Sequence, residues 1–309
     1  MIDNLIDGLK NKNIISISKL ITRIENNSPE SVEINNAVFS LINNSYRIGI
    51  TGPPGAGKST ITNLLIQHFR ALKKSIAVLL IDPSSPFSGG ALLGDRIRMG
   101  MHHDDPDVFI RSIATRGSKG GLSSSSSEIA DILDASGFDI IIFETVGVGQ
   151  IEVDVIEQVD TVILTLVPES GDDIQMMKAG VIEIADIFLI NKSDRKDSDK
   201  LYTSLENILQ ISSNKSSWLP PIIKTIGTKD IGVDILLKEL MNHQKFLSIS
   251  ENKINKYNDR YLNKINNRLS EQIKNKFWSK KNQEIFKNEL SKKYNKRLSP
   301  DQLIKKMYR

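Results

Sequence analysis

Apolar runs and helical patterns alternate along the middle of the chain, from residue 46 to residue 247. Short, nearly continuous runs of Ile, Val, Leu and Phe predict buried strands, and apolar residues at every third or fourth position predict helices between them. This alternation is typical of an α/β fold with a mostly parallel sheet that is covered by helices on both faces. The predicted strands are the run before residue 52 and residues 75–81, 108–112, 138–143, 161–167, 187–190 and 222–226, and the predicted helices are 57–73, 122–136, 172–185, 197–211 and 230–247.

Helical segments flank this region on both sides. Before it, Ser28 and Pro29 predict the start of a short helix, as a cap and a first-turn proline. After it, apolar residues recur every three or four positions from Ile254 to Phe277. Such a stripe needs another surface to cover it, either the main domain or a second subunit. We therefore expect an N-terminal helical lead-in (1–45), a main domain (46–247) and a C-terminal helical arm (248–309).

Composition limits the class of protein. The 309 residues include no cysteine, which excludes disulfides and thiolate metal sites and is typical of a cytoplasmic protein. No apolar run approaches the roughly 18 residues that a membrane span needs. The first residues lack the basic and apolar pattern of a signal peptide. We therefore expect a cytoplasmic protein without a membrane partner.

Charge is distributed unevenly along the chain. From Glu251 onward there are 17 basic and 6 acidic residues, a net charge of +11, whereas the rest of the chain has a net charge of −7. A basic segment of this kind can bind nucleic acid or an anionic membrane. It can equally be the solvated face of helices that carry an apolar stripe, and we expect no nucleic-acid partner.

A glycine-rich segment, G-x-x-x-x-G-K-S, follows the first predicted strand and opens the first helix of the main domain. Strand, glycine loop and helix form the context that a phosphate-binding P-loop requires. The glycines let several backbone N–H groups approach one anion, and the helix N-terminus adds its positive end. Lys58 would reach the outer phosphates and the Ser59 hydroxyl would bind Mg²⁺. The predicted phosphate-binding residues are Gly52, Pro53, Pro54, Gly55, Ala56, Gly57, Lys58, Ser59 and Thr60.

A second motif, N-K-S-D at residues 191–194, follows another apolar strand. The Asp194 carboxylate can accept two hydrogen bonds from the ring N–H and the amino group of guanine, a donor pair that adenine lacks. Asn191 would fix the loop and Lys192 would lie along the base. The segment Thr225, Ile226 and Gly227, after the last strand, is predicted to close the base pocket with its backbone N–H groups.

Acidic residues follow two further strands, at the edge of the sheet where a P-loop protein binds its ligand. Glu144 could hold Mg²⁺, and Gly147 could bring its N–H close to the γ-phosphate. Gln150 could orient the attacking water or have a structural role. Asp82 and Asp95 are further candidates near the phosphates.

Five segments together resemble the MeaB/ArgK family of G-protein chaperones. They are G-P-P-G-A-G-K-S-T (52–60), D-P-S-S (82–85), G-D-R (94–96), E-T-V-G-V-G-Q (144–150) and N-K-S-D (191–194). The resemblance implies a P-loop NTPase fold and slow, Mg²⁺-dependent hydrolysis of GTP to GDP, with Mg²⁺ near Ser59, Asp82, Asp95 and Glu144. It also implies a homodimer through the C-terminal helices and control of adenosylcobalamin loading into an acyl-CoA mutase of the methylmalonyl-CoA mutase type. The segment 168–178 would couple to the mutase through Glu169, Asp172, Asp173 and Lys178.

The chain departs from the family pattern at three places, namely Ser124–Ser127, Glu169-Ser170 and Thr225-Ile226. These departures concern nucleotide affinity and mutase coupling more than the fold. A transport-associated kinase or ATPase is an alternative, although no motif for an acceptor pocket is visible. A targeting GTPase of the signal-recognition type is another, although it would need a Met-rich apolar domain that the basic tail does not provide.

Overall fold

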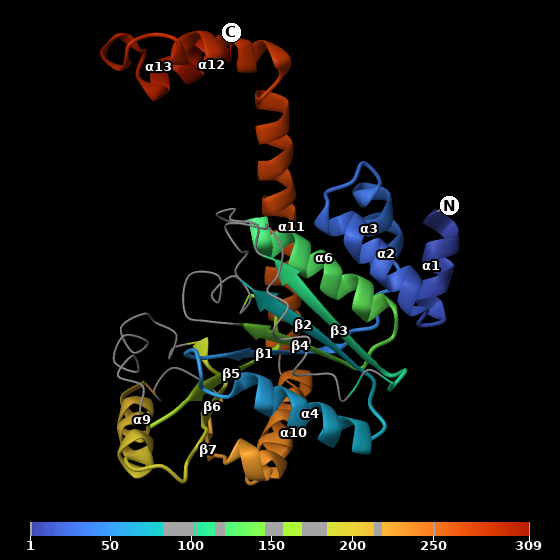
Figure 1. Cartoon of the computed structure of the whole chain (residues 1–309), viewed down its shortest axis with the longest axis vertical. Helices are drawn as coiled ribbons and strands as arrows, with labels where there is room; N and C mark the ends of the chain where they lie inside the picture. The colour runs from blue at the N-terminus through green and yellow to red at the C-terminus, as the bar shows by residue number, and fades with distance from the viewer. Residues whose placement is uncertain are drawn as a thin grey trace. The chain divides into compact units, whose positions relative to one another are not determined.

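Seven parallel strands form a single sheet in the described part of the chain, in the order β3-β2-β4-β1-β5-β6-β7 (Figure 1). The computed structural model describes residues 2–82, 102, 104–114, 121–145, 157–168, 184–212, 218–249 and 251–308. The strands are β1 (Tyr46–Thr51), β2 (Ile76–Asp82), β3 (Val108–Ala114), β4 (Ile140–Thr145), β5 (Thr161–Leu166), β6 (Ile187–Ile190) and β7 (Ile222–Lys224).

The central strands of the sheet are buried on both faces. All six residues of β1, β4 and β5 are buried, which is the expected result for strands that are covered on both faces. β1 lies at the centre, because it pairs with β4 on one side and with β5 on the other. The predicted α/β fold with a parallel sheet is therefore confirmed, and the carboxyl ends of the strands meet at one edge.

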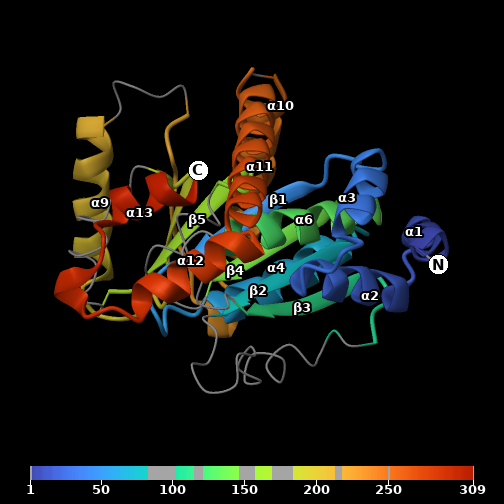
Figure 2. The same cartoon turned by 90° about the horizontal axis from the view of Figure 1, so that it is seen from above.

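Helices cover both faces of the sheet, as Figures 1 and 2 show. On one face, α4 (Lys58–Ala71) and α10 (Val233–Ile249) pack on alternate residues of the central strands. On the other face, α6 (Gly121–Ala135) and the N-terminal helices contribute to one apolar core, and α9 (Ser198–Ser212) packs on β5 and β6. The predicted helix 172–185 lies almost entirely outside the described residues.

Three helices form the N-terminal part, α1 (Ile2–Lys10), α2 (Ile14–Glu25) and α3 (Ser31–Phe39). The predicted helix start at Ser28 is wrong, since α3 begins at Ser31. Residues 28–30 instead form a turn in which the Ser31 N–H donates to the Ser28 carbonyl at 2.9 Å. A Ser-Pro-Glu sequence fits a turn as well as a helix start, so the local pattern could not separate them.

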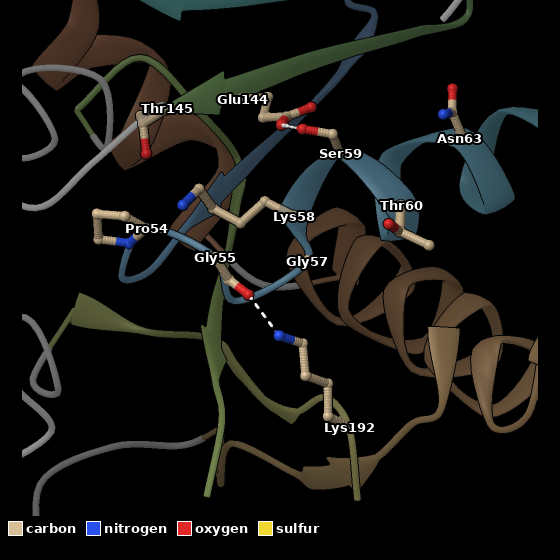
Figure 3. Close-up of a pocket in the computed structure, with 10 residues that line it drawn as sticks. All are labelled: Pro54, Gly55, Gly57, Lys58, Ser59, Thr60, Asn63, Glu144, Thr145 and Lys192. Carbon is tan, nitrogen blue, oxygen red and sulfur yellow. Dashed lines mark hydrogen bonds between the residues drawn. The ribbon is translucent and has the colours of Figure 1, made fainter. Parts of the chain in front are cut away.

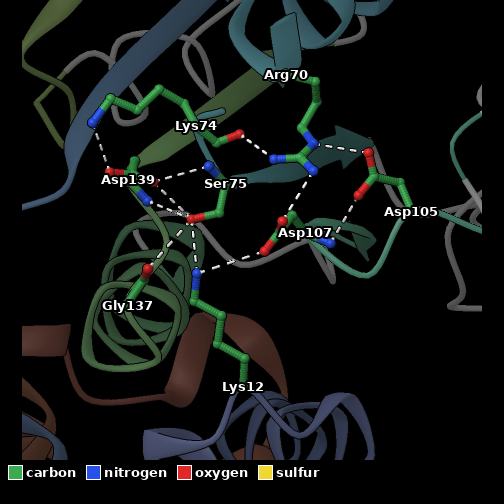
Figure 4. A network of polar contacts seen from close by, with 8 residues as sticks. All are labelled: Lys12, Arg70, Lys74, Ser75, Asp105, Asp107, Gly137 and Asp139. Carbon is green, nitrogen blue, oxygen red and sulfur yellow. Dashed lines mark hydrogen bonds and ion pairs between the residues drawn. The ribbon is translucent and has the colours of Figure 1, made fainter. Parts of the chain in front are cut away.

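Charged side chains connect several elements at the amino edge of the sheet, opposite the strand ends that carry the motifs (Figure 4). Arg70, at the end of α4, donates to Asp105 at 2.8 Å and forms an ion pair with Asp107 at 2.9 Å. Asp139 accepts from the Ser75 N–H at 2.9 Å. The hydrogen bond from Arg70 holds the pKa of Asp105 below its usual value. This network fixes the starts of β2, β3 and β4.

The described chain divides into two compact units, Met1–Lys256 and Tyr257–Arg309. The second unit contains most of α11 (Asn252–Phe277) with α12 (Lys280–Leu290) and α13 (Pro300–Met307). Ser299 caps α13 in a capping box, as its sequence predicts. Along α11, Ile265, Leu269 and Ile273 are each about half exposed. No described helix is long and apolar enough to cross a membrane.

Candidate functional site

The phosphate loop connects β1 to α4 at the carboxyl edge of the sheet. Its backbone has positive φ at Gly52 (142°), Gly55 (75°) and Gly57 (89°). A Cβ on Gly52 would lie 2.0 Å from the carbonyl oxygen of Thr165, and one on Gly57 would lie 2.3 Å from the Asn191 side chain. Both positions therefore require glycine for their conformation and for the space around them. Gly57 caps α4, whose N-terminus adds a positive field at the loop.

Lys58 begins α4 and is buried, with 6% of its surface exposed. Its ammonium group donates to the carbonyls of Gly52 at 2.7 Å and Pro53 at 3.0 Å. The loop thus wraps around its own lysine, which places a positive charge beside the loop backbone. This arrangement is suited to a multiply charged anion.

Ser59 and Glu144 meet across the site from different elements. The Ser59 hydroxyl, on α4, donates to Glu144 Oε1 at 2.5 Å, and the Glu144 side chain is buried at the end of β4 (Figure 3). The sequence predicted both residues as metal ligands, and the structure brings them together from positions 85 residues apart. A hydroxyl and a carboxylate in contact are a suitable pair of oxygen ligands for Mg²⁺.

These groups line a cavity of about 590 Å³ (Figure 3). The volume is within the range of a small-molecule site. Two of its lining residues, Asn63 and Thr145, were not identified from the sequence. Asn63 follows Ser59 by one helical turn and so shares its face of α4, a spacing that could have revealed it. The cavity is lined by Pro54, Gly55, Gly57, Lys58, Ser59, Thr60, Asn63, Glu144, Thr145 and Lys192.

Asn191 is the structural centre of the N-K-S-D segment, which follows β6. Its buried carboxamide donates to the Ala56 carbonyl at 2.8 Å and accepts from the Gly227 N–H at 3.1 Å and the Thr225 hydroxyl at 3.2 Å. Lys192 donates to the Gly55 carbonyl at 2.8 Å (Figure 3). The segment is therefore bound to the phosphate loop, as the sequence analysis expected of Asn191. The Asp194 side chain is exposed.

The segment after β7 differs from its prediction. Its N–H groups were expected to face a base, but all three donate within the protein. The Thr225 N–H donates to the Ile190 carbonyl at 2.9 Å, the Ile226 N–H to the Ile231 carbonyl at 3.1 Å, and the Gly227 N–H to Asn191. The turn closed by the Ile226–Ile231 bridge engages only the Ile226 N–H, while β6 and Asn191 engage the other two, and the sequence pattern revealed none of these contacts.

Several predicted site residues lie outside the described part of the chain. Asp82 ends β2 at the expected edge, but its side chain is not described. Among the residues that the structure describes, no group of three or more His, Cys, Asp or Glu side chains could hold a metal ion. The predicted residues outside the described ranges are Asp95, Gly147, Gln150, Glu169, Asp172, Asp173 and Lys178.

The sequence of the chain matches a protein family over most of its length. The family profile described as "Methylmalonyl Co-A mutase-associated GTPase MeaB" matches residues 17–282. A candidate GTPase of Pyrococcus horikoshii is 50% identical over 252 residues, which cover 81% of this chain and 80% of that protein.

Two other similarities are weaker. The mitochondrial methylmalonic aciduria type A homologue of Mus musculus is 37% identical over 193 residues, covering 61% of this chain and 46% of that protein. The crystal structure of an LAO/AO transport system kinase matches with a TM-score of 0.72 and 23% identity, covering 99% of this chain and 96% of that one. At this identity the structural match supports the fold alone.

Proposed function

The chain belongs to the family of methylmalonyl-CoA mutase-associated GTPases, and on this premise we propose that it is a GTP-hydrolysing chaperone of an adenosylcobalamin-dependent acyl-CoA mutase. The observation that carries the hydrolytic part is the contact between Ser59 and Glu144 beside the buried Lys58. These three side chains place two oxygen ligands and one positive charge at the mouth of a phosphate loop.

The residues present fit Mg²⁺, which takes oxygen ligands. The Ser59 hydroxyl and the Glu144 carboxylate would hold the ion, directly or through water. Asp82, at the end of β2, and Asp95, outside the described residues, would add negative charge. When bound, Mg²⁺ neutralises charge on the β- and γ-phosphates. Lys58 contributes a second positive charge to the same oxygens.

Guanine selectivity would come from the segment that Asn191 binds to the phosphate loop. The exposed Asp194 carboxylate would accept the two donors of guanine, and Lys192 would cover the base. Thr225 and Gly227 would support this pocket through Asn191, to which the Thr225 hydroxyl and the Gly227 N–H donate, while Ile226 holds the turn that follows.

Hydrolysis transfers the γ-phosphoryl group of GTP to water and releases GDP and phosphate. Gly147 and Gln150 would position the γ-phosphate and the attacking water. No arginine finger was recognised in the sequence, and such a residue contributes about 10³–10⁵ to the rate of related enzymes. We therefore expect slow turnover by the isolated protein and faster turnover when its partner binds.

The chaperone function requires that bound nucleotide alters a second surface. The segment 168–178, with Glu169, Asp172, Asp173 and Lys178, follows β5 in the sequence, and β5 ends at the same edge of the sheet as β1, which leads into the phosphate loop. To move this segment from a mostly inactive to a mostly active conformation, a ligand must bind the active conformation about 5.5 kcal/mol more strongly than the inactive one. The charge-assisted contacts of a γ-phosphate and its metal ion are of that magnitude when several form together. The segment would then control entry of adenosylcobalamin into the mutase.

Assembly as a homodimer would cover the stripe on α11. Ile265, Leu269 and Ile273 are about half exposed, and an apolar surface of this length is unusual for a monomer. The lysines of the same helices would remain in solvent.

Cofactor transfer tests the proposal. Adenosylcobalamin delivery to an acyl-CoA mutase is measured in the presence of GTP, GDP or no nucleotide. We expect the transferred fraction to depend on the nucleotide. Equal transfer under all three conditions would refute the chaperone function and leave the GTPase assignment unaffected.

A further inference from the structure

Thr51 and Thr145 form a buried hydroxyl pair at the point where two site strands separate. The Thr145 hydroxyl lies 3.2 Å from the Thr51 hydroxyl and 3.4 Å from the Ile50 carbonyl, within hydrogen-bond distance of both. The two residues are 3% and 2% exposed, so water does not compete for this contact. Ninety-four positions separate them in the chain.

The backbone pairing explains why a side-chain contact matters here. The pairing of β1 with β4 ends at Ile50 and Glu144. One residue later, Thr51 pairs with Leu164 of β5, and Thr145 pairs with Ile81 of β2. Beyond the last backbone pair, the two hydroxyl groups therefore connect β1 with β4.

Each threonine adjoins a residue of the site. Thr51 directly precedes Gly52, the first residue of the phosphate loop. Thr145 directly follows Glu144 and itself lines the cavity. The hydroxyl pair thus connects the strand that carries the phosphate loop and Ser59 with the strand that carries Glu144.

We propose that Thr51 and Thr145 are positioning residues, which set the position of the Glu144 carboxylate relative to the phosphate loop. This inference rests on the proposed GTPase function and adds to it two residues that act through Glu144. Mg²⁺ tolerates little deviation from octahedral geometry, so a small displacement of one ligand weakens its binding. Displacements of about 1 Å can lower catalytic rates by about a hundredfold. Nucleotide affinity should change little, because Lys58 and the loop backbone are unaltered.

Isosteric variants distinguish the effect of the threonine hydroxyl from that of its methyl group. Thr145→Val and Thr51→Val each remove the hydrogen bond while nearly preserving volume, and Thr145→Ser retains the hydroxyl. Thr165→Val, on the other neighbour of β1, is a matched control, because the buried Thr165 hydroxyl has no hydrogen-bond partner among the residues that the structure describes. The full-length proteins are compared in their kcat for GTP hydrolysis, their Mg²⁺ requirement and their affinity for GDP in EDTA.

We expect Thr145→Val and Thr51→Val to lower kcat about tenfold and to raise the half-saturating Mg²⁺ concentration, since each loses one buried hydrogen bond. GDP affinity in EDTA should remain within about twofold of that of the parent, while Thr145→Ser and Thr165→Val should retain the parent kcat. The double valine variant should be no slower than Thr145→Val, because that substitution alone already removes both contacts of the Thr145 hydroxyl, with Thr51 and with the Ile50 carbonyl.

Three results would overturn the inference. They are a Thr145→Ser variant as slow as Thr145→Val, additive losses in the double variant, or equal losses of GDP affinity and kcat. If the parent hydrolyses ATP instead of GTP, the guanine assignment is wrong, but the roles of Thr51 and Thr145 can still be tested. The variants would then be compared in their ATP hydrolysis. A parent that hydrolyses no nucleoside triphosphate would refute both proposals.

Discussion

Asn191→Ala would remove a buried carboxamide that joins the phosphate loop to the segment after β7. Three hydrogen bonds are lost, to Ala56, Thr225 and Gly227, at 2.8, 3.2 and 3.1 Å. A hydrogen bond contributes about 0.5–1.5 kcal/mol, and a buried partner left unsatisfied costs about 1–3 kcal/mol. We therefore expect the free energy of unfolding to fall by about 2–4 kcal/mol.

Thermal unfolding measures this change. For a unit of this size, about 2–4 kcal/mol corresponds to a decrease in the unfolding midpoint of about 4–16 °C. GDP affinity, measured by calorimetry, should fall at least about tenfold, because the N-K-S-D segment is no longer held against the phosphate loop. Asn191→Asp should lose mainly the contact with Ala56, since its carboxylate still accepts from Gly227 but cannot donate.

A matched control supports the comparison. Asn242 lies exposed on α10 and contacts Glu239 at 3.2 Å, so Asn242→Ala should change the free energy of unfolding by less than about 0.5 kcal/mol. If Asn191→Ala unfolds at the parent temperature and binds GDP with the parent affinity, the three contacts do not stabilise the site and the reasoning is refuted.

Four further predictions concern other residues. Glu144→Gln should raise the Mg²⁺ concentration needed for half-maximal GTP hydrolysis, measured by phosphate release; an unchanged requirement would contradict the metal assignment. Asp194→Asn should shift binding from guanine to xanthine nucleotides, because xanthine has a carbonyl where guanine has an amino group; competition with labelled GDP tests this. Arg70 lowers the pKa of Asp105 in the folded protein, so the charged carboxylate stabilises the fold at pH values above about 3.9, its pKa in the unfolded chain. This contribution is lost as the pH falls through the lower pKa of the folded protein. Asp105→Asn should therefore lose less stability than the parent between pH 6 and pH 3 in urea unfolding, and equal losses would contradict the assignment. Leu269→Glu should halve the mass measured by light scattering, because a charge on the stripe opposes dimer formation; a parent that is already monomeric would refute the dimer.

The sequence predicted those parts of the site that depend on local pattern. Gly52 and Gly57 were recognised because the P-loop spacing is local, and Glu144 because an acid directly follows an apolar strand. The contact between Ser59 and Glu144 could be expected only after both had been placed at the same edge of a parallel sheet.

The remaining parts depend on contacts between distant residues. Thr145 pairs with Thr51 across 94 positions, and no periodicity in either strand indicates it. The N–H group of Ile226 was assigned to a base, although a bridge to Ile231 already uses it. Strand boundaries also differ by a few residues, since β4 begins at Ile140 and not at Phe138.

The amino and carboxyl edges of the sheet differ in the interactions that their residues make. At the amino edge, charged side chains such as Arg70 and Asp105 fix the strand starts through ion pairs that need no ligand (Figure 4). At the carboxyl edge, Gly55 and Gly57 bring the backbone close to a cavity, and Lys58 and Glu144 bring charge into it. The Lys58 ammonium and the Glu144 carboxylate both line this cavity, so a bound anion and a bound cation would each meet a group of opposite charge there. Ion pairs therefore hold the amino edge without a ligand, whereas charged groups line a cavity at the carboxyl edge, as the nucleotide-dependent function proposed above requires.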